Sequence, residues 1–248
     1  MDHEHFLCND VRPDGAASSR VGLFEAQGFC VWERFLTPAA VSALETEIAR
    51  LTTMRREART HGVVLGVDGL PMVMNRIDRD SDLLFDLHRH PALLIVATTL
   101  LQDSVVPLHV EYFAKRGESN AATPPHQDAW FYREHFSEMA LAIWLPLDDV
   151  GPSSGALEYA LPSPMVLLPH GRTDARDFDG ALLDDGGLDN LSFVPALVPS
   201  GGCVAHHSLV IHRAPPNRSK QERRAVVFNY RRSPFRSQMK HSHDTRAT

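Results

Sequence analysis

The stretch Thr123-Pro-Pro-His-Gln-Asp128 holds a histidine and an aspartate two residues apart. On a β-strand this spacing points both side chains to one face, so that their ligand atoms converge on one point. A further histidine, His212, stands far downstream and precedes a strand-like run over residues 225–230. Two imidazoles and one carboxylate form the facial triad that binds non-haem Fe(II) and leaves three coordination positions open. We therefore predict a metal and reaction centre formed by His126, Asp128 and His212.

Short β-prone runs surround this motif in the second half of the chain, and Pro, Gly, Asp and Asn residues separate them. They cover residues 106–113, 140–147, 156–161, 202–211 and 225–230. The first half is helical in pattern: one helix begins at Thr37, a second covers residues 81–88 and a third begins near Pro91. Helices followed by many strands predict an α+β, mainly β, fold in which N-terminal helices cover an antiparallel sandwich.

The length of 248 residues, of which 43% are hydrophobic, fits a single domain spanning residues 1–248. Residues 1–20 and 236–248 are polar, and we expect flexible tails there. The acidic segment over residues 162–198 is expected to be a loop-rich insert that closes over the site as a lid. A calcium loop is the alternative for its aspartates, but their spacing matches no EF-hand.

The charge balance restricts the partners of the protein. A net charge of −6 and a pI near 6.1 argue against nucleic acid and anionic membranes as partners. No apolar run is long enough to span a membrane, and the N-terminus has no apolar core typical of a signal peptide. Three scattered cysteines indicate a reducing compartment. We expect a cytoplasmic monomer or homodimer that acts on a small molecule.

In its motifs the chain resembles the phytanoyl-CoA dioxygenase family of Fe(II)- and 2-oxoglutarate-dependent oxygenases. The matching motifs are His126-Gln-Asp128, Leu141-Ala-Ile-Trp-Leu-Pro-Leu-Asp-Asp149, Ser154-Gly-Ala-Leu-Glu158, and His206-His-Ser-Leu-Val-Ile-His212 running into Asn217 and Arg223. They follow the family order between residues 105 and 231. The resemblance implies a double-stranded β-helix, the jelly-roll or cupin-like fold.

Two positions depart from the family pattern. After Leu161 the chain reads Pro-Ser-Pro-Met, where the family usually has Pro-Gly-Ser-His. Before the distal strand it reads Gly-Gly-Cys203, where the family usually has Gly-Asp. Neither stretch supplies a metal ligand, so the departures concern loop geometry and substrate contacts.

The resemblance also implies roles for single residues. His212 is preferred over His206 as the distal ligand because Asn217 and Arg223 follow it in family order, which leaves His206 a supporting or core role. Arg223 is expected to bind the distal carboxylate of 2-oxoglutarate through its planar guanidinium. Its neighbour Arg224 should face the other way. Trp144 is expected either beside the cosubstrate or in the core.

Three consecutive aromatic residues, Trp130, Phe131 and Tyr132, follow the metal motif. They cannot all face one core on a strand, so we expect at least one of them to line the substrate mouth. The alternative is a hydrophobic plug at the rim of the barrel.

The resemblance implies Fe(II) as cofactor, with 2-oxoglutarate and O2 as cosubstrates and succinate and CO2 as products. Halogenating relatives lack the carboxylate ligand, whereas Asp128 is present here, so we expect hydroxylation of a small soluble metabolite, amino-acid-like or secondary. Desaturation, epimerisation or ring closure by the same oxidant stays open. A non-catalytic jelly roll that binds a metal or ligand is a further alternative, but it would have no need of Arg223 as a carboxylate clamp.

Overall fold

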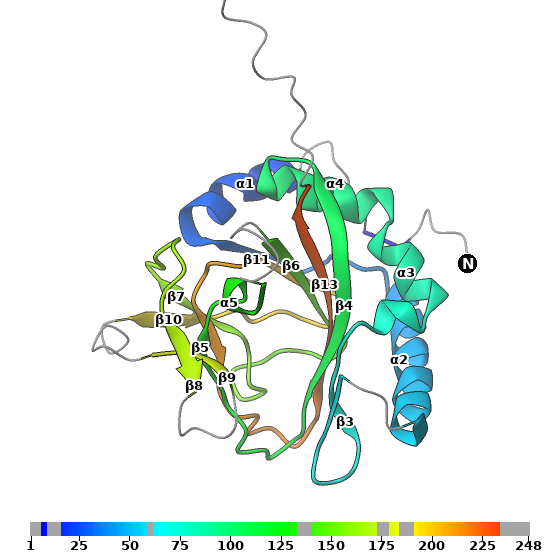
Figure 1. The fold of residues 1–248 in the computed structure, drawn as a ribbon. Coiled ribbons are helices and arrows are strands. Elements are labelled where there is room, and N and C mark those ends of the chain that lie inside the picture. Colours follow the sequence, from blue (N-terminus) through cyan, green and yellow to red (C-terminus); the bar gives the residue numbers. More distant parts are fainter. Residues whose placement is uncertain are drawn as a thin grey trace, which may run out of the picture.

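A computed structural model describes residues 6–8, 16–58, 62–132, 140–172, 179–183 and 191–233 (Figure 1). The helices are α1 (Ala16–Gln27), α2 (Pro38–Ala58), the 3-10 turn η3 (Ile77–Arg79), α3 (Asp82–His88), α4 (Pro91–Leu101) and α5 (Ala129–Tyr132). The strands of the first half are β1 (Phe29–Trp32), β2 (Val63–Leu65), β3 (Pro71–Met74), β4 (Val105–Lys115) and β5 (Thr123–His126). Those of the second half are β6 (Ala140–Pro146), β7 (Glu158–Leu161), β8 (His170–Arg172), β9 (Asp179–Leu182), β10 (Ser192–Pro195), β11 (Cys203–His207), β12 (His212–Ala214) and β13 (Arg223–Arg232).

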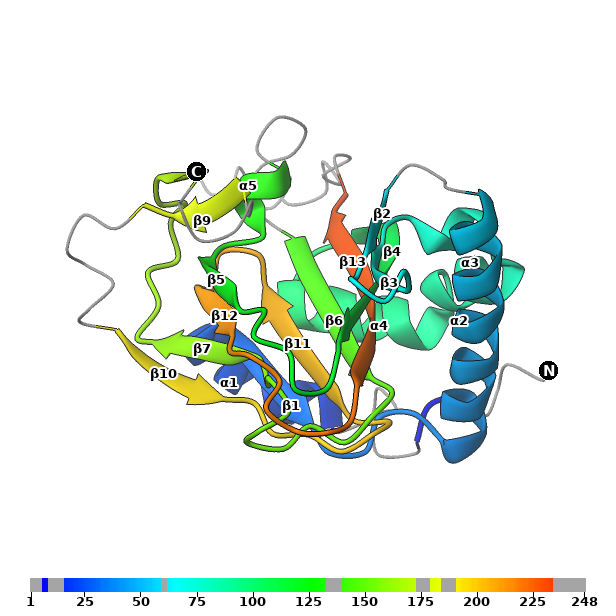
Figure 2. The ribbon, with the colours of Figure 1, turned by 90° about the horizontal axis from the view of Figure 1, so that it is seen from below.

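Two antiparallel sheets form the jelly roll. The larger sheet has the order β1-β11-β6-β13-β4-β3-β2 and the smaller one has the order β10-β7-β12-β5. Figure 1 shows α1 to α4 along the outer side of the large sheet, with β5, β7 and β10 on the opposite side, and Figure 2 shows the same layers from below. The predicted mainly β fold with covering helices is therefore confirmed.

Side-chain alternation divides the large sheet between two cores. On β13, Val226, Phe228 and Tyr230 pack with the helices, whereas Ala225 and Val227 pack inside the barrel. Arg223 has the same parity as the inward residues, and Arg224 has that of the outward ones. The alternation therefore points the two arginines to opposite sides of the sheet, as the sequence predicted.

The structure corrects two sequence-based expectations and limits a third. Residues 1–20 are not a tail throughout, since α1 begins at Ala16, and Phe6 and Leu7 are buried, with Leu7 bridged to Leu36. Asp128 is not on a strand, because β5 ends at His126 and the chain turns into α5. The segment over residues 162–198 contains β8, β9 and β10, and β10 joins the small sheet.

The C-terminal tail over residues 236–248 lies outside the described residues. Among the described helices, none has the length and apolar character needed to cross a bilayer.

Candidate metal centre

The two ligand histidines predicted from the sequence are neighbours across the small sheet. His126 closes β5, His212 opens β12, and the two residues are direct partners in the antiparallel register, with ring centroids 4.2 Å apart. Asp128 follows two residues later, where the amide of Phe131 donates to its carbonyl oxygen at the start of α5. The sequence placed Asp128 beside His126 on one face of a strand. In the structure, the turn into α5 brings the carboxylate of Asp128 to that position instead.

The ligand atoms of His126, Asp128 and His212 all lie within 4.8 Å of one another. Oδ1 of Asp128 is 3.5 Å from Nε2 of His126 and 3.6 Å from Nε2 of His212. Nδ1 of His126 lies 2.9 Å from the carbonyl of Pro124, and Nδ1 of His212 lies 3.1 Å from that of Val210. A carbonyl only accepts, so each Nδ1 donates and each Nε2 keeps a lone pair for a cation.

The electrostatics of the cluster favour its metal-binding protonation state. Burial, assisted by the neighbouring His126, lowers the pKa of His212 to about 3, so its ring is neutral near pH 7. Burial alone would raise the pKa of Asp128, but His212, His126 and His206 hold it well below its usual range. A neutral imidazole at His212 and an ionised carboxylate at Asp128 fit a divalent cation of the non-haem iron type.

His206, the competitor of His212 in the sequence, lies on the other side of Asp128. Its Nε2 is 3.0 Å from Oδ2 of Asp128, whereas Oδ1 faces the two ligand imidazoles. Its Nδ1 is 2.9 Å from the hydroxyl of Tyr159, a fully buried side chain. The carboxylate accepts from Nε2–H, and Nδ1 of the same ring is hydrogen-bonded to the tyrosine hydroxyl. A chain of hydrogen bonds therefore fixes the direction of the carboxylate.

Gln127, between the two proximal ligands, is fully buried and anchors the start of the 162–198 segment. Its amide nitrogen donates to the carbonyls of Val166 and Leu209, and its amide oxygen accepts from the backbone N–H of Leu168. The backbone N–H of Gln127 donates to Nε2 of His170 at 3.0 Å. Nothing in the sequence singled out these contacts, because each joins residues about forty or more positions apart.

Arg223 is buried inside the barrel beside Trp144, its guanidinium carbon 5.3 Å from the indole ring centre. Within the described part of the chain, Nε and Nη1 of Arg223 are buried and have no hydrogen-bond partner. Burial lowers the pKa of Arg223 to about 10, so it remains a cation at neutral pH. A buried cation with unsatisfied donors is costly unless an anion pairs with it, and a carboxylate is an anion that a guanidinium binds strongly.

The turn between β12 and β13 is shaped by Asn217. Its side-chain nitrogen donates to the carbonyls of Lys115 and Gln221, and its oxygen accepts from Ser219. Gly155 lies against this turn with a φ of +74°, and a Cβ there would be 2.8 Å from the carbonyl oxygen of Pro215. The Ser-Gly motif therefore lets the loop after the distal ligand pack closely.

The three consecutive aromatic residues lie on α5 and diverge. Trp130 stacks on His170, with ring centres 5.9 Å apart, and Tyr132 lies 5.8 Å from His109. Phe131 meets His126 edge-on at 6.1 Å and is 45% exposed. Of the three, Phe131 combines contact with a ligand histidine and access to solvent.

A jelly roll that carries a His-x-Asp…His cluster inside has the ligand set that non-haem iron proteins use. The chain belongs to the phytanoyl-CoA dioxygenase family, whose model matches residues 24–225. Phytanoyl-CoA dioxygenase domain-containing protein 1 of Danio rerio is 30% identical over 131 residues, 50% of this chain and 44% of that protein. The Rattus norvegicus protein of the same name is 27% identical over 133 residues, 50% of this chain and 45% of that protein. The match thus spans less than half the length of either relative.

Solved structures share the fold over most of the chain. The epimerase SnoN in complex with Fe3+, alpha ketoglutarate and nogalamycin RO has a TM-score of 0.70 at 24% identity, over 88% of this chain and 85% of that one. The carbocyclase SnoK from nogalamycin biosynthesis has a TM-score of 0.69 at 19% identity, over 89% and 85%. EctD from S. alaskensis with 2-oxoglutarate and 5-hydroxyectoine has a TM-score of 0.71 at 17% identity, over 92% and 79%. At these identities the likeness establishes the jelly-roll fold.

Proposed function

We propose that the protein is an Fe(II)- and 2-oxoglutarate-dependent dioxygenase that hydroxylates a small soluble metabolite, amino-acid-like or secondary, and releases succinate and CO2. The observation that carries the proposal is the buried, unsatisfied guanidinium of Arg223 in the same barrel as the His126, Asp128 and His212 cluster. A metal-binding module without oxygenase chemistry has no use for a carboxylate clamp at that place.

Different residues would bind the metal, the cosubstrate and the substrate. His126, Asp128 and His212 would hold Fe(II), which supplies activation of O2 with 2-oxoglutarate when bound. Arg223 would orient 2-oxoglutarate by pairing with its distal carboxylate, and Trp144 would pack beside that pair. Phe131, from α5, would line the substrate mouth beside His126, with Trp130 and Tyr132 flanking it. An apolar rim of this kind keeps water away from the reacting carbon.

Epimerisation or ring closure is the second candidate function, and the folds of SnoN and SnoK favour keeping it, since those proteins are an epimerase and a carbocyclase. The same metal and cosubstrate would serve these outcomes. Product analysis separates them: hydroxylation adds one oxygen atom to the substrate, ring closure removes two hydrogens and epimerisation leaves the mass unchanged.

We further propose a cytoplasmic monomer or homodimer, with the three cysteines as free thiols. The function is tested by succinate formation from 2-oxoglutarate under O2 with added Fe(II), first alone and then with a metabolite library. The expected result is slow succinate release that a substrate accelerates and that His126→Ala abolishes. No succinate from the metal-loaded wild type, or equal release by the variant, would contradict the proposal.

A further inference from the structure

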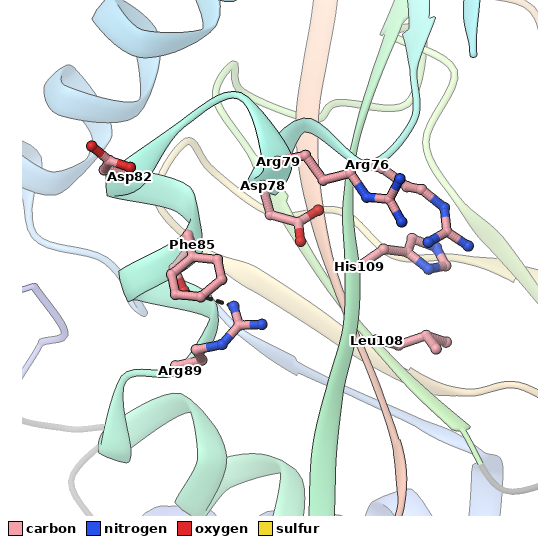
Figure 3. A pocket seen from close by; sticks show the side chains of 8 residues that line it. All are labelled: Arg76, Asp78, Arg79, Asp82, Phe85, Arg89, Leu108 and His109. Atoms are coloured by element: carbon pink, nitrogen blue, oxygen red, sulfur yellow. Dashed lines mark hydrogen bonds between the residues drawn. The ribbon is translucent and has the colours of Figure 1, made fainter. Parts of the chain in front are cut away.

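A pocket of about 500 Å³ lies outside the metal cluster, between η3, α3 and β4. It is lined by Arg76, Asp78, Arg79, Asp82, Phe85, Arg89, Leu108 and His109. Among the described residues, β3 pairs with β4 only at Phe113 and Tyr112, so no described strand pairs with Leu108 and His109 on that side of β4. Figure 3 shows Phe85 and Arg89 reaching the pocket from α3 on one side and His109 lying on the other.

The charged side chains of this pocket differ in whether they already interact with other groups of the protein. Arg76 and Arg79 are exposed, and no described side chain makes a hydrogen bond or ion pair with either guanidinium. Arg89 stacks on Phe85, its guanidinium carbon 3.5 Å above the ring centre. Of the two carboxylates, Asp78 accepts the backbone N–H of Val110 at 3.0 Å, and Asp82 lies in the first turn of α3, where the helix dipole favours it. The lining therefore has more positive than negative charges, and the guanidinium groups of Arg76 and Arg79 are available to bind an anion.

His109 lines this pocket and also contacts α5. It is only 8% exposed, and its Nε2 lies 3.3 Å from a carboxylate oxygen of Glu111. Its Nδ1 is buried and has no hydrogen-bond partner among the described residues. The ring lies 5.8 Å from that of Tyr132, which ends the helix that follows Asp128. The pocket and the aromatic residues of α5 therefore meet at His109.

The backbone that carries the free arginines is fixed in advance by Arg55 of α2. This buried side chain donates to the carboxylate of Asp80 at 2.6 and 2.9 Å, and to the carbonyls of Asn75 and Arg76 at 2.6 and 3.1 Å. It thereby clamps the chain on both sides of η3. A site whose backbone is already ordered loses less entropy when a ligand binds.

We propose that this pocket binds a single oxyanion group of the substrate, a carboxylate or a phosphate ester, between Arg76 and Arg79. The inference rests on the proposed oxygenase function and adds the class of substrate to it. Guanidinium forks match the geometry of both oxyanions, while Phe85 and Leu108 offer apolar surface to the adjoining carbon skeleton. The carboxylates of Asp78 and Asp82 repel further negative charge, so the site selects one oxyanion and disfavours a polyphosphate chain.

Binding is tested with inorganic phosphate and with acetate, titrated by calorimetry at constant ionic strength. The protein carries Mn(II) and a 2-oxoglutarate analogue that cannot be decarboxylated, so that Arg223 is already occupied. The wild type should bind one equivalent of at least one anion, and the pair of anions shows which oxyanion is preferred. Arg76→Gln with Arg79→Gln should weaken binding at least about 10-fold, and the double Lys variant should recover part of it. The control is Arg34→Gln, an exposed arginine outside the pocket.

The outcomes separate the pocket from the oxygenase proposal. No saturable binding of either anion to the wild type, or equal binding by the double Gln variant, would overturn the oxyanion site. A substrate found by coupled succinate release should carry an oxyanion, and its KM should rise at least about 10-fold in the double Gln variant but not in Arg34→Gln. A neutral substrate with an unchanged KM would overturn the site and leave the oxygenase standing. Anion binding without any succinate formation would instead overturn the oxygenase function.

Discussion

His206 donates from Nε2 to Oδ2 of Asp128 over 3.0 Å and thereby leaves Oδ1 facing the imidazoles of His126 and His212. The two oxygens of one carboxylate thus have separate tasks. Hydrogen-bond partners that orient a metal ligand commonly affect metal affinity by 10–100-fold. We therefore propose that His206 positions Asp128, although it is on a different sheet from the two histidines that the motif identifies.

Removing this partner should weaken metal binding without removing a ligand. His206→Leu is expected to raise the Kd for Mn(II), measured by calorimetry, by about 10-fold, because Asp128 loses its fixed direction. His206→Gln retains a donor and should recover part of the affinity, and Tyr159→Phe should have a smaller effect. His207→Gln, one residue further and packed beside Phe24, is the control. Unchanged Mn(II) affinity in His206→Leu would contradict the positioning role.

Removing a ligand should have a larger effect. His126→Ala and His212→Ala are each expected to abolish 2-oxoglutarate turnover, because two remaining ligands hold Fe(II) poorly. Metal content after anaerobic loading and succinate release are the two measurements. If His212→Ala kept near-normal metal binding while His206→Leu lost it, the distal ligand would be His206 instead.

The adjacent arginines of β13 offer a matched pair. Arg223→Ala should raise the KM for 2-oxoglutarate by roughly 10- to 100-fold, and Arg223→Lys should restore only part of the loss. Arg224 faces outward and binds Asp148 and Glu45, so Arg224→Ala should leave that KM unchanged and lower the melting temperature. Equal effects on KM at both positions would mean that the cosubstrate does not bind at Arg223.

Gly155 tests the packing of the loop behind the distal ligand. Gly155→Ala should cost about 1–3 kcal/mol of unfolding free energy, because an alanine at a φ of +74° is strained and its Cβ meets Pro215. Gly151→Ala is the control, since a Cβ there has no neighbour within 4 Å. Denaturant melts measure both variants, and equal stability of the two would refute the close-packing argument.

Gln127 should govern the 162–198 segment, which we propose to be a lid over the substrate. The amide of Leu168 is expected to exchange slowly with solvent, since it donates to the buried Gln127 side chain. Gln127→Leu should speed that exchange and increase 2-oxoglutarate decarboxylation that is not coupled to product. Substrate should add protection at β8 and β9 in the wild type. If coupling stayed complete in Gln127→Leu, the segment would have no part in closure.

The sequence predicts features that depend on a local residue pattern or on a family motif. Strand alternation separated Arg223 from Arg224, and the order of the motifs preferred His212 over His206. The strand argument for Asp128 was wrong in detail, because β5 ends before it, yet the turn into α5 brings it to the same cluster.

Contacts made by the tertiary fold could not be predicted in this way. The hydrogen bond of His206 to Asp128 joins β11 to the turn between β5 and α5, across 78 positions of the chain. Arg76 and Arg79 lie at the two ends of η3 and Arg89 directly follows α3, so in the sequence they look like scattered charges in an acidic chain. Only the packing of η3 and α3 against β4 brings them to one pocket.

The direct pairing of His126 with His212 also bears on how the chain stays folded. β5 is the outermost strand of the small sheet, and two of its four residues are prolines, which donate no amide hydrogen to the ladder. An ion held between the two imidazoles is a cross-link at this weak margin, and it exists only in the folded chain, so the folded population grows with the concentration of free metal. The supply of iron to the cell would then set the lifetime of the protein as well as its rate of turnover.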